Sequence, residues 1–214
     1  MAVLATAAIA AFGASSAPVS FVILNTMAVR PGKLPDGWML KVNRGTPDVA
    51  TTTGEAEGRV LRLRSRASSF SLERGVEVDI GQYPYLTWKW KVTELPKGGD
   101  FRRSSTDDQA AQVLVAFSDR RILTYIWDTS APKGSWQSAS SIPLVHIFAL
   151  VCRSGAEEVG QWLSETRNLV EDYRRAYGNA SARVKGIRLQ INTQHTGTSA
   201  ESFFGEVAFQ SSAQ

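Results

Sequence analysis

The stretch Tyr85-Leu86-Thr87-Trp88-Lys89-Trp90-Lys91-Val92 decides the fold class of this chain. Every second residue of it, from Leu86 to Val92, is large and apolar, and two of the residues between are lysines. Successive side chains of a β-strand point to opposite faces, so the pattern predicts a strand with one apolar and one polar face. We expect Trp88 and Trp90 on the apolar face, in the core of the protein.

Further strands are predicted on both sides of this stretch. They cover residues 60–65, 70–78, 110–117, 122–127, 144–151, 184–191 and 203–209. Arg74-Gly75 interrupts the second of these, and a hairpin through residues 118–121 joins the third to the fourth. Many short strands separated by close turns are typical of a two-sheet sandwich or barrel.

One helix is predicted within residues 169–177, where apolar residues recur at helical spacing and Gly178 ends the pattern. Residues 43–58 are rich in Thr, Gly and Pro and predict a loop with at most one edge strand. Residues 132–141 predict a long loop, and long loops inside a domain often carry function.

The 214 residues fit one domain, which we place at residues 18–214. Residues 2–14 carry no charge and are followed by small residues, which resembles a secretory signal over residues 1–17, so we expect a periplasmic or secreted protein. No later apolar run is long enough to predict a transmembrane helix. The net charge is +4, but the basic residues are scattered, so nucleic acid is not an expected partner.

No sequence motif points to a reaction. A phosphate-binding loop, a dinucleotide fingerprint and zinc-ligand spacing are all missing from the sequence. Cys152 is the only cysteine and lies in an apolar run, which predicts a buried thiol that forms no internal disulfide.

Two adjacent carboxylates, Asp107 and Asp108, precede the predicted strand 110–117. Two neighbouring negative charges repel each other, so they are kept in solvent, paired with arginine, or bound to a cation. Oxygen ligands of this kind suit calcium, and Arg102 or Arg103 would serve equally well as partners.

The hairpin places Trp127 at the same end as this acidic pair, and the loop around Trp136 follows in the sequence. We therefore hypothesise a rim for a polar ligand that Asp107, Asp108, Trp127 and Trp136 form together. The alternative is that arginine neutralises the acids and that both indoles are structural.

Six segments of the chain resemble the bacterial exported family known as domain of unknown function 3047. They are 34–38, 84–92, 107–111, 125–127, residues 167–168 with 172–174, and 203–209. The resemblance implies a mostly β fold, a two-sheet antiparallel jelly-roll sandwich with one short helix, similar to carbohydrate-binding modules. It implies no reaction.

Three further residues complete the predicted sites. Arg167 and His195 join the ligand-binding set, and Glu206 joins Asp107 and Asp108 as a calcium ligand. The segment 192–195 carries amides where the family tends to have acids, and Gly205-Glu206 replaces a usual Gly-Asp, so a cation site shared with relatives would be weaker here.

Three functions fit these observations. The first is a non-catalytic exported domain that binds a glycan or another envelope component. The second is a hydrolase or lyase of envelope polysaccharide, in which Asp107 or Asp108 acts together with Glu165 or Glu206. The third is a scaffold that binds another protein through a sheet edge. Two carboxylates that face each other across a cleft would favour the enzyme.

Overall fold

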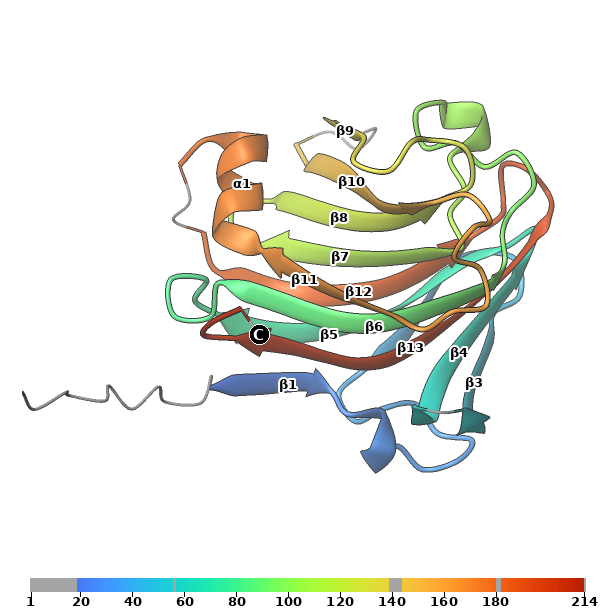
Figure 1. Ribbon diagram of the computed structural model, residues 1–214, viewed down its shortest axis with the longest axis horizontal. Coiled ribbons are helices and arrows are strands. Elements are labelled where there is room, and N and C mark those ends of the chain that lie inside the picture. Colours follow the sequence, from blue (N-terminus) through green and yellow to red (C-terminus); the bar gives the residue numbers. More distant parts are fainter. Residues whose placement is uncertain (1–18, 56, 139–143, 180–181, 214) are drawn as a thin grey trace, which may run out of the picture.

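The computed structural model describes residues 19–55, 57–138, 144–179 and 182–213. Two β-sheets pack face to face, and one helix lies at an end of the sandwich (Figure 1). This confirms the predicted fold class. The signal-like segment 1–17 lies outside the described residues, and export stays a prediction.

The first sheet has six strands in the order β11-β6-β13-β4-β3, and β1 pairs with the free part of β13. The strands are β1 (Ser20–Leu24), β3 (Asp48–Glu55), β4 (Gly58–Arg66), β6 (Tyr85–Glu94), β11 (Leu163–Asn168) and β13 (Ser199–Gln210). The deciding stretch of the sequence is β6, and it lies between β11 and β13.

The second sheet has seven strands in the order β2-β5-β12-β7-β8-β10-β9. They are β2 (Met39–Arg44), β5 (Ser69–Val78), β7 (Ala111–Phe117), β8 (Arg121–Asp128), β9 (Trp136–Ser138), β10 (His146–Ser154) and β12 (Val184–Asn192). The predicted hairpin is confirmed, since β7 and β8 pair antiparallel. β8 and β10 are parallel, so the sheet is mixed rather than purely antiparallel.

Aromatic side chains from both sheets form the centre of the core. Trp88 and Trp90 on β6 are 1% and 0% exposed, which confirms their predicted place. Across the sandwich, Tyr125 packs on Trp88 with ring centroids 5.2 Å apart, and Trp127 packs on Trp90 at 6.0 Å. Tilted and edge-on ring contacts of this kind add to the free energy of burial.

The helix α1 (Leu169–Tyr177) begins and ends where its sequence signals predict. Asn168 is its N-cap and accepts hydrogen bonds from the backbone N–H groups of Val170 and Glu171, while Gly178 follows its last residue. Two short 3-10 turns, η1 (Thr26–Ala28) and η2 (Ser104–Thr106), are the other helical segments of the described chain. None of these helices has the length and apolar character of a membrane span.

β3 is the one edge strand that the prediction for residues 43–58 allowed. Two local predictions differ from the structure. β9 lies within the predicted loop 132–141, of which residues 139–141 are outside the described chain. β5 continues without a break through Arg74-Gly75. Cys152 is buried as predicted, and burial raises the pKa of its thiol, so the thiol is unreactive at neutral pH.

Candidate functional site

The predicted acidic pair lies at the open end of the β7–β8 hairpin, but its two members have different environments. Asp108 is fully buried, and its Oδ2 accepts backbone N–H groups of His195 at 3.0 Å and Thr196 at 2.6 Å. These bonds tie the start of β7 to the turn between β12 and β13. The carboxylate of Asp108 therefore holds this turn in place. The oxygen that makes these hydrogen bonds is one that a cation would need as a ligand.

Asp107 is only half-buried, and its carboxylate accepts a hydrogen bond from Gln109 Nε2 at 2.9 Å. Burial raises the pKa of this carboxyl above its usual value. The backbone oxygen of Asp107 accepts a hydrogen bond from Asn192 Nδ2 at 2.7 Å and lies 3.1 Å from Nδ1 of the exposed His195. The structure thus brings Asp107, Asp108 and His195 together.

Trp127 does not join this group on the surface. Its backbone pairs with Ala111, near the acidic pair, but its indole points into the core and is fully buried. The indole Nε1 donates to the carbonyl oxygen of Gly155 at 3.1 Å. A ligand on the surface cannot reach this ring, so Trp127 has no place in a binding rim.

Trp136 and Arg167 lie in two other parts of the molecule. The half-buried ring of Trp136 packs against Phe148, and the guanidinium of Arg175 lies 4.8 Å from its centre. Arg167 on β11 pairs with the buried carboxylate of Asp172, which also accepts the hydroxyl of Tyr125. Both predicted ligand contacts are therefore engaged in packing or ion pairs.

The predicted calcium ligands do not meet. Glu206 is on β13 of the six-stranded sheet, where it lines a small hollow with Lys89 and Gln210, whereas Asp107 and Asp108 precede β7 of the other sheet. Within the described residues there is no group of three or more His, Cys, Asp or Glu side chains that could hold a metal ion.

Glu165, a candidate catalytic acid in the hydrolase hypothesis, faces the interior of the sandwich. Its Oε1 accepts Arg153 Nε at 2.6 Å and Trp90 Nε1 at 3.3 Å. This carboxylate lies on an edge strand of the six-stranded sheet and does not face either member of the acidic pair across a cleft.

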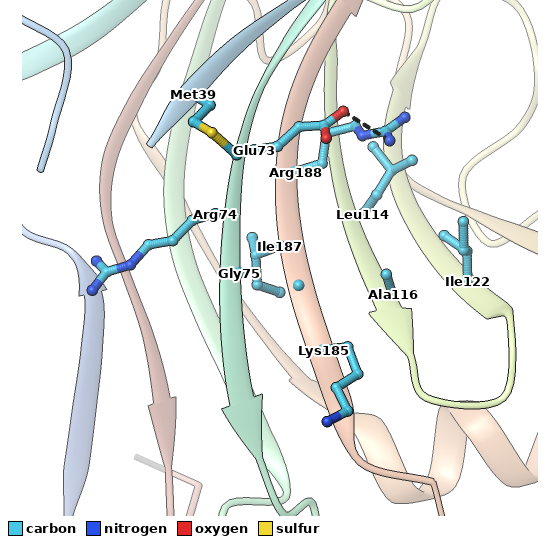
Figure 2. A pocket seen from close by; sticks show the side chains of 11 residues that line it. Met39, Glu73, Arg74, Gly75, Leu114, Ala116, Ile122, Lys185, Ile187 and Arg188 are labelled. Atoms are coloured by element: carbon cyan, nitrogen blue, oxygen red, sulfur yellow. Dashed lines mark ion pairs between the residues drawn. The ribbon is translucent and has the colours of Figure 1, made fainter. Parts of the chain in front are cut away.

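The outer face of the seven-stranded sheet holds a different candidate, which the sequence did not reveal. A shallow hollow of about 200 Å³ lies over β5, β12 and β7, and we call it the trough (Figure 2). Its lining residues are Met39, Glu73, Arg74, Gly75, Leu114, Ala116, Ile122, Lys185, Gly186, Ile187 and Arg188.

A ridge of side chains borders the trough on one side. Met39, Glu73, Arg188 and Leu114 are direct partners on four neighbouring strands, β2, β5, β12 and β7, so they form one row across the sheet. At the centre of the ridge, Glu73 Oε1 lies 2.8 Å from Arg188 Nη2. Figure 2 shows this ion pair, with Lys185 at the opposite side of the trough.

The floor of the trough is a second row, two residues further along the strands. Gly75 on β5 lies opposite Gly186 on β12, which lies opposite Ala116 on β7. Ile122 on β8 follows as the partner of Ala116 and ends the row. The floor is therefore mostly backbone, with a single methyl group from Ala116.

The ion pair of the ridge has hydrogen-bonding capacity that faces solvent. Glu73 Oε1 also accepts Ser71 Oγ at 3.2 Å and lies 3.8 Å from Lys41 Nζ. These contacts and the contact to Arg188 are all made by Oε1. The side chains of Glu73 and Arg188 are 27% and 30% exposed, respectively. Together they offer an acceptor and planar donors side by side.

Two loops close the rest of the outer face, over β8 and β10. Phe101 and Ala131 from these loops pack on Ile126, Ala149 and Val151 in a separate apolar cluster. Asp128, at the end of β8, anchors both loops because its carboxylate accepts the N–H groups of Phe101 at 2.9 Å and Ala131 at 2.7 Å. These loops therefore cover one part of the outer face, and the trough lies in a part that they leave open.

The sequence contained a weak signal for the trough. Arg74-Gly75 interrupts the apolar alternation of β5, and Gly186 lies within β12. Glycine inside a strand often marks a bulge or the close approach of another group to the backbone. Only the pairing of β5 with β12 shows that the two glycines lie opposite each other.

Comparison with known proteins gives a family and a fold. The model of a family described as a protein of unknown function, DUF3047, matches residues 38–208, which is more than half of the chain. No curated protein matches the sequence.

Several solved structures are similar to this chain at low sequence identity. The xyloglucanase domain of NopAA, a type three effector from Sinorhizobium fredii in complex with cellobiose, has 10% identity and a TM-score of 0.52, over 91% of this chain and 96% of that chain. The family 11 carbohydrate-binding module of Lic26A-Cel5E from Clostridium thermocellum has 8% identity and a TM-score of 0.49, over 93% and 98%.

Endoglucanase Cel12A from Rhodothermus marinus has 9% identity and a TM-score of 0.49, over 90% of this chain and 99% of that chain. At this level of identity, the likeness to the NopAA domain establishes the fold, a jelly-roll sandwich, and nothing about the ligand or the reaction.

Proposed function

The chain belongs to the DUF3047 family, and we propose that it is a glycan-binding domain without hydrolytic activity, with the trough as its binding site. The observation that carries the proposal is the pairing of a polar ridge with a floor of backbone and small apolar groups on the open part of the outer face. Sugars combine hydroxyl groups at the ring edge with apolar C–H groups on the ring faces. The ridge and the floor offer matching partners for both.

The charges of the trough favour binding over hydrolysis. Glu73 is the one carboxylate among the residues that line it, within the part of the chain that the structure describes. Glycoside hydrolysis of the common kind needs two carboxyl groups that flank the bond to be cleaved. Glu73 is also held by an ion pair with Arg188, and no second carboxylate faces it across the trough among the described lining residues.

The covered and the open parts of the outer face support the same assignment. The loops anchored by Asp128 close the sheet over β8 and β10, which leaves a bounded depression and not a flat surface. A bounded depression restricts the orientation of a ligand, whereas a flat surface is more typical of contacts with another protein.

Glycan binding by the purified chain tests the proposal directly. We expect isothermal titration calorimetry to detect binding of at least one oligosaccharide from a panel of plant and bacterial polysaccharide fragments. Glu73→Gln removes the charge and half of the acceptor capacity, and it should weaken binding about 10- to 100-fold, because hydrogen bonds to charged groups contribute about 1.5–3 kcal/mol.

Glu201→Gln is the matched control, since Glu201 is a partly buried acid on the six-stranded sheet that accepts Thr93 Oγ1 at 2.7 Å. It should bind as the wild type does. Equal binding by the Glu73→Gln and wild-type proteins would place the site elsewhere. Release of new reducing ends from any bound polysaccharide would overturn the claim that the domain is non-catalytic.

A further inference from the structure

The trough has a shape that restricts which glycans it can take. Resting on the proposed function, we infer that its ligand is a neutral, unbranched chain of β-linked pyranoses that crosses the strands, and that Gly75 determines this specificity. The direction of the ridge and the conformation of the two glycines carry this inference.

The ridge fixes the direction of the ligand. Its four residues run across β2, β5, β12 and β7 and would block a chain that lay along the strands. The floor row runs beside the ridge over the same strands. From Gly75 to Ala116 the floor spans two strand spacings, about 10 Å, which is the length of a disaccharide.

Gly75 has no role in the backbone conformation that would require glycine. Neither Gly75 nor Gly186 has a positive φ. A Cβ built on Gly186 would lie 3.3 Å from the carbonyl oxygen of Arg74, so packing explains this glycine in part, but a Cβ on Gly75 would meet no atom within 4 Å. Glycine inside a strand costs conformational entropy, and folding gains nothing from it at this exposed position.

A flat floor selects the shape of the sugar. A pyranose with equatorial hydroxyl groups has two flat C–H faces and presents its hydroxyl groups at the rim of the ring. One face can lie on the backbone of Gly75 and Gly186, while the rim hydroxyls reach Glu73 and Arg188 on one side and Lys185 on the other. β-Linkages between such rings keep the chain flat, whereas α-linkages or branches would lift it from the floor.

The lining also favours a neutral ligand. Glu73 contacts both Arg188 and Lys41, Lys185 contacts Glu77, and Arg74 donates to the carbonyl oxygen of Ile23, so each of these basic groups already has an oxygen partner. An anionic sugar would have to approach Glu73, which borders the trough. Hydroxyl groups can add to these ion pairs without breaking them.

Side chains added to the floor test the inference. Gly75→Ala and Gly75→Leu place a methyl and an isobutyl group on the floor, and both should keep or raise the melting temperature because the site is open and φ is not positive. With cellohexaose as the probe, Gly75→Leu should weaken binding about 10- to 100-fold, and Gly75→Ala less. Thr166→Leu, on the exposed face of β11, is the control and should bind as the wild type does.

The wild type should also bind cellohexaose at least tenfold more tightly than maltohexaose, which is α-linked, or a branched xyloglucan oligosaccharide. Equal binding of the straight and branched or α-linked probes would overturn the assigned class of glycan. Unchanged binding by Gly75→Leu, together with a loss in Glu73→Gln, would reject the floor but keep the proposed function. If the wild type binds no glycan of the panel, the proposed function itself fails.

Discussion

The two faces of the seven-stranded sheet differ in kind, although the same strands form both. On β8, Tyr125 and Trp127 point inward and are fully buried, while Ile122 and Thr124 point to the outer face. On β7, Val113 and Val115 point inward, while Leu114 lies on the outer ridge. The aromatic side chains of β8 lie on the inner face, which packs against the other sheet and excludes water. On the outer face, backbone, aliphatic side chains and charged groups line the trough, and no aromatic ring is among its described lining residues.

This difference shows why aromatic content was a poor guide to the ligand site. A tryptophan at the end of a strand has an even chance of pointing outward when the strand is considered alone. Burial of a large ring against a facing sheet contributes several kcal/mol to the free energy of folding, so such rings are more favourable in the core than at the surface. Trp127 accordingly packs on Trp90 and not at a rim.

The largest expected effect comes from truncating the inner face. Trp88→Ala should lower the free energy of unfolding by about 3–5 kcal/mol, because the ring is 1% exposed and packs on Tyr125. Met39→Ala, on the outer ridge and 68% exposed, should change it by about 0.5 kcal/mol at most. Denaturant unfolding followed by tryptophan fluorescence and circular dichroism measures both.

Similar losses for Trp88→Ala and Met39→Ala would contradict the distinction between the two faces. A loss of glycan binding in Met39→Ala without a loss of stability would sharpen it, because it would place this thioether among the ligand contacts.

The next largest effect concerns the adjacent acids Asp107 and Asp108. Like the two faces of the sheet, they differ in burial, since Asp108 is fully buried and Asp107 is half-buried. Asp108→Ala should cost about 1–3 kcal/mol, since it leaves the buried N–H groups of His195 and Thr196 without their acceptor. Asp107→Asn should cost little at pH 7, because burial already raises the pKa of that carboxyl and so disfavours its charged form.

Thermal and denaturant unfolding of the two variants at pH 7 would test this contrast, and calorimetry should show glycan binding like that of the wild type in both. Weaker binding in Asp108→Ala at full stability would instead restore a ligand role for the acidic pair.

The smallest effect is a dependence on pH at the loop that covers the outer face. Hydrogen bonds from Arg102 lower the pKa of Asp100, which precedes Phe101 in this loop. A lowered pKa contributes stability that is present above the ordinary value of 3.8 and is lost as pH falls through the folded value.

Unfolding free energies measured from pH 6 down to pH 2.5 should therefore fall less steeply for Asp100→Asn than for the wild type, with the two curves converging at the acid end. Parallel curves would show that the ion pair makes no contribution to stability.

Much of the fold was predictable because strand periodicity is local. The alternation in residues 85–92 predicted β6 and its buried face, and the apolar run 110–117 with the turn after it predicted the β7–β8 hairpin. The helix α1 followed from apolar spacing and Gly178. β9 was missed because its short, polar sequence resembles a loop and gains its strand conformation by pairing with β10.

The sequence by itself determined which segments form strands, which tryptophans of β6 are buried, and that Asp107 and Asp108 lie near an end of the sheet. Only the tertiary structure decided the outward face of β8, the backbone partners of Asp108, and the meeting of Glu73 with Arg188. A period of two says that a strand has two faces, but not which face another layer covers. Pairing between distant strands decides that, and the trough exists only where β5, β12 and β7 come together.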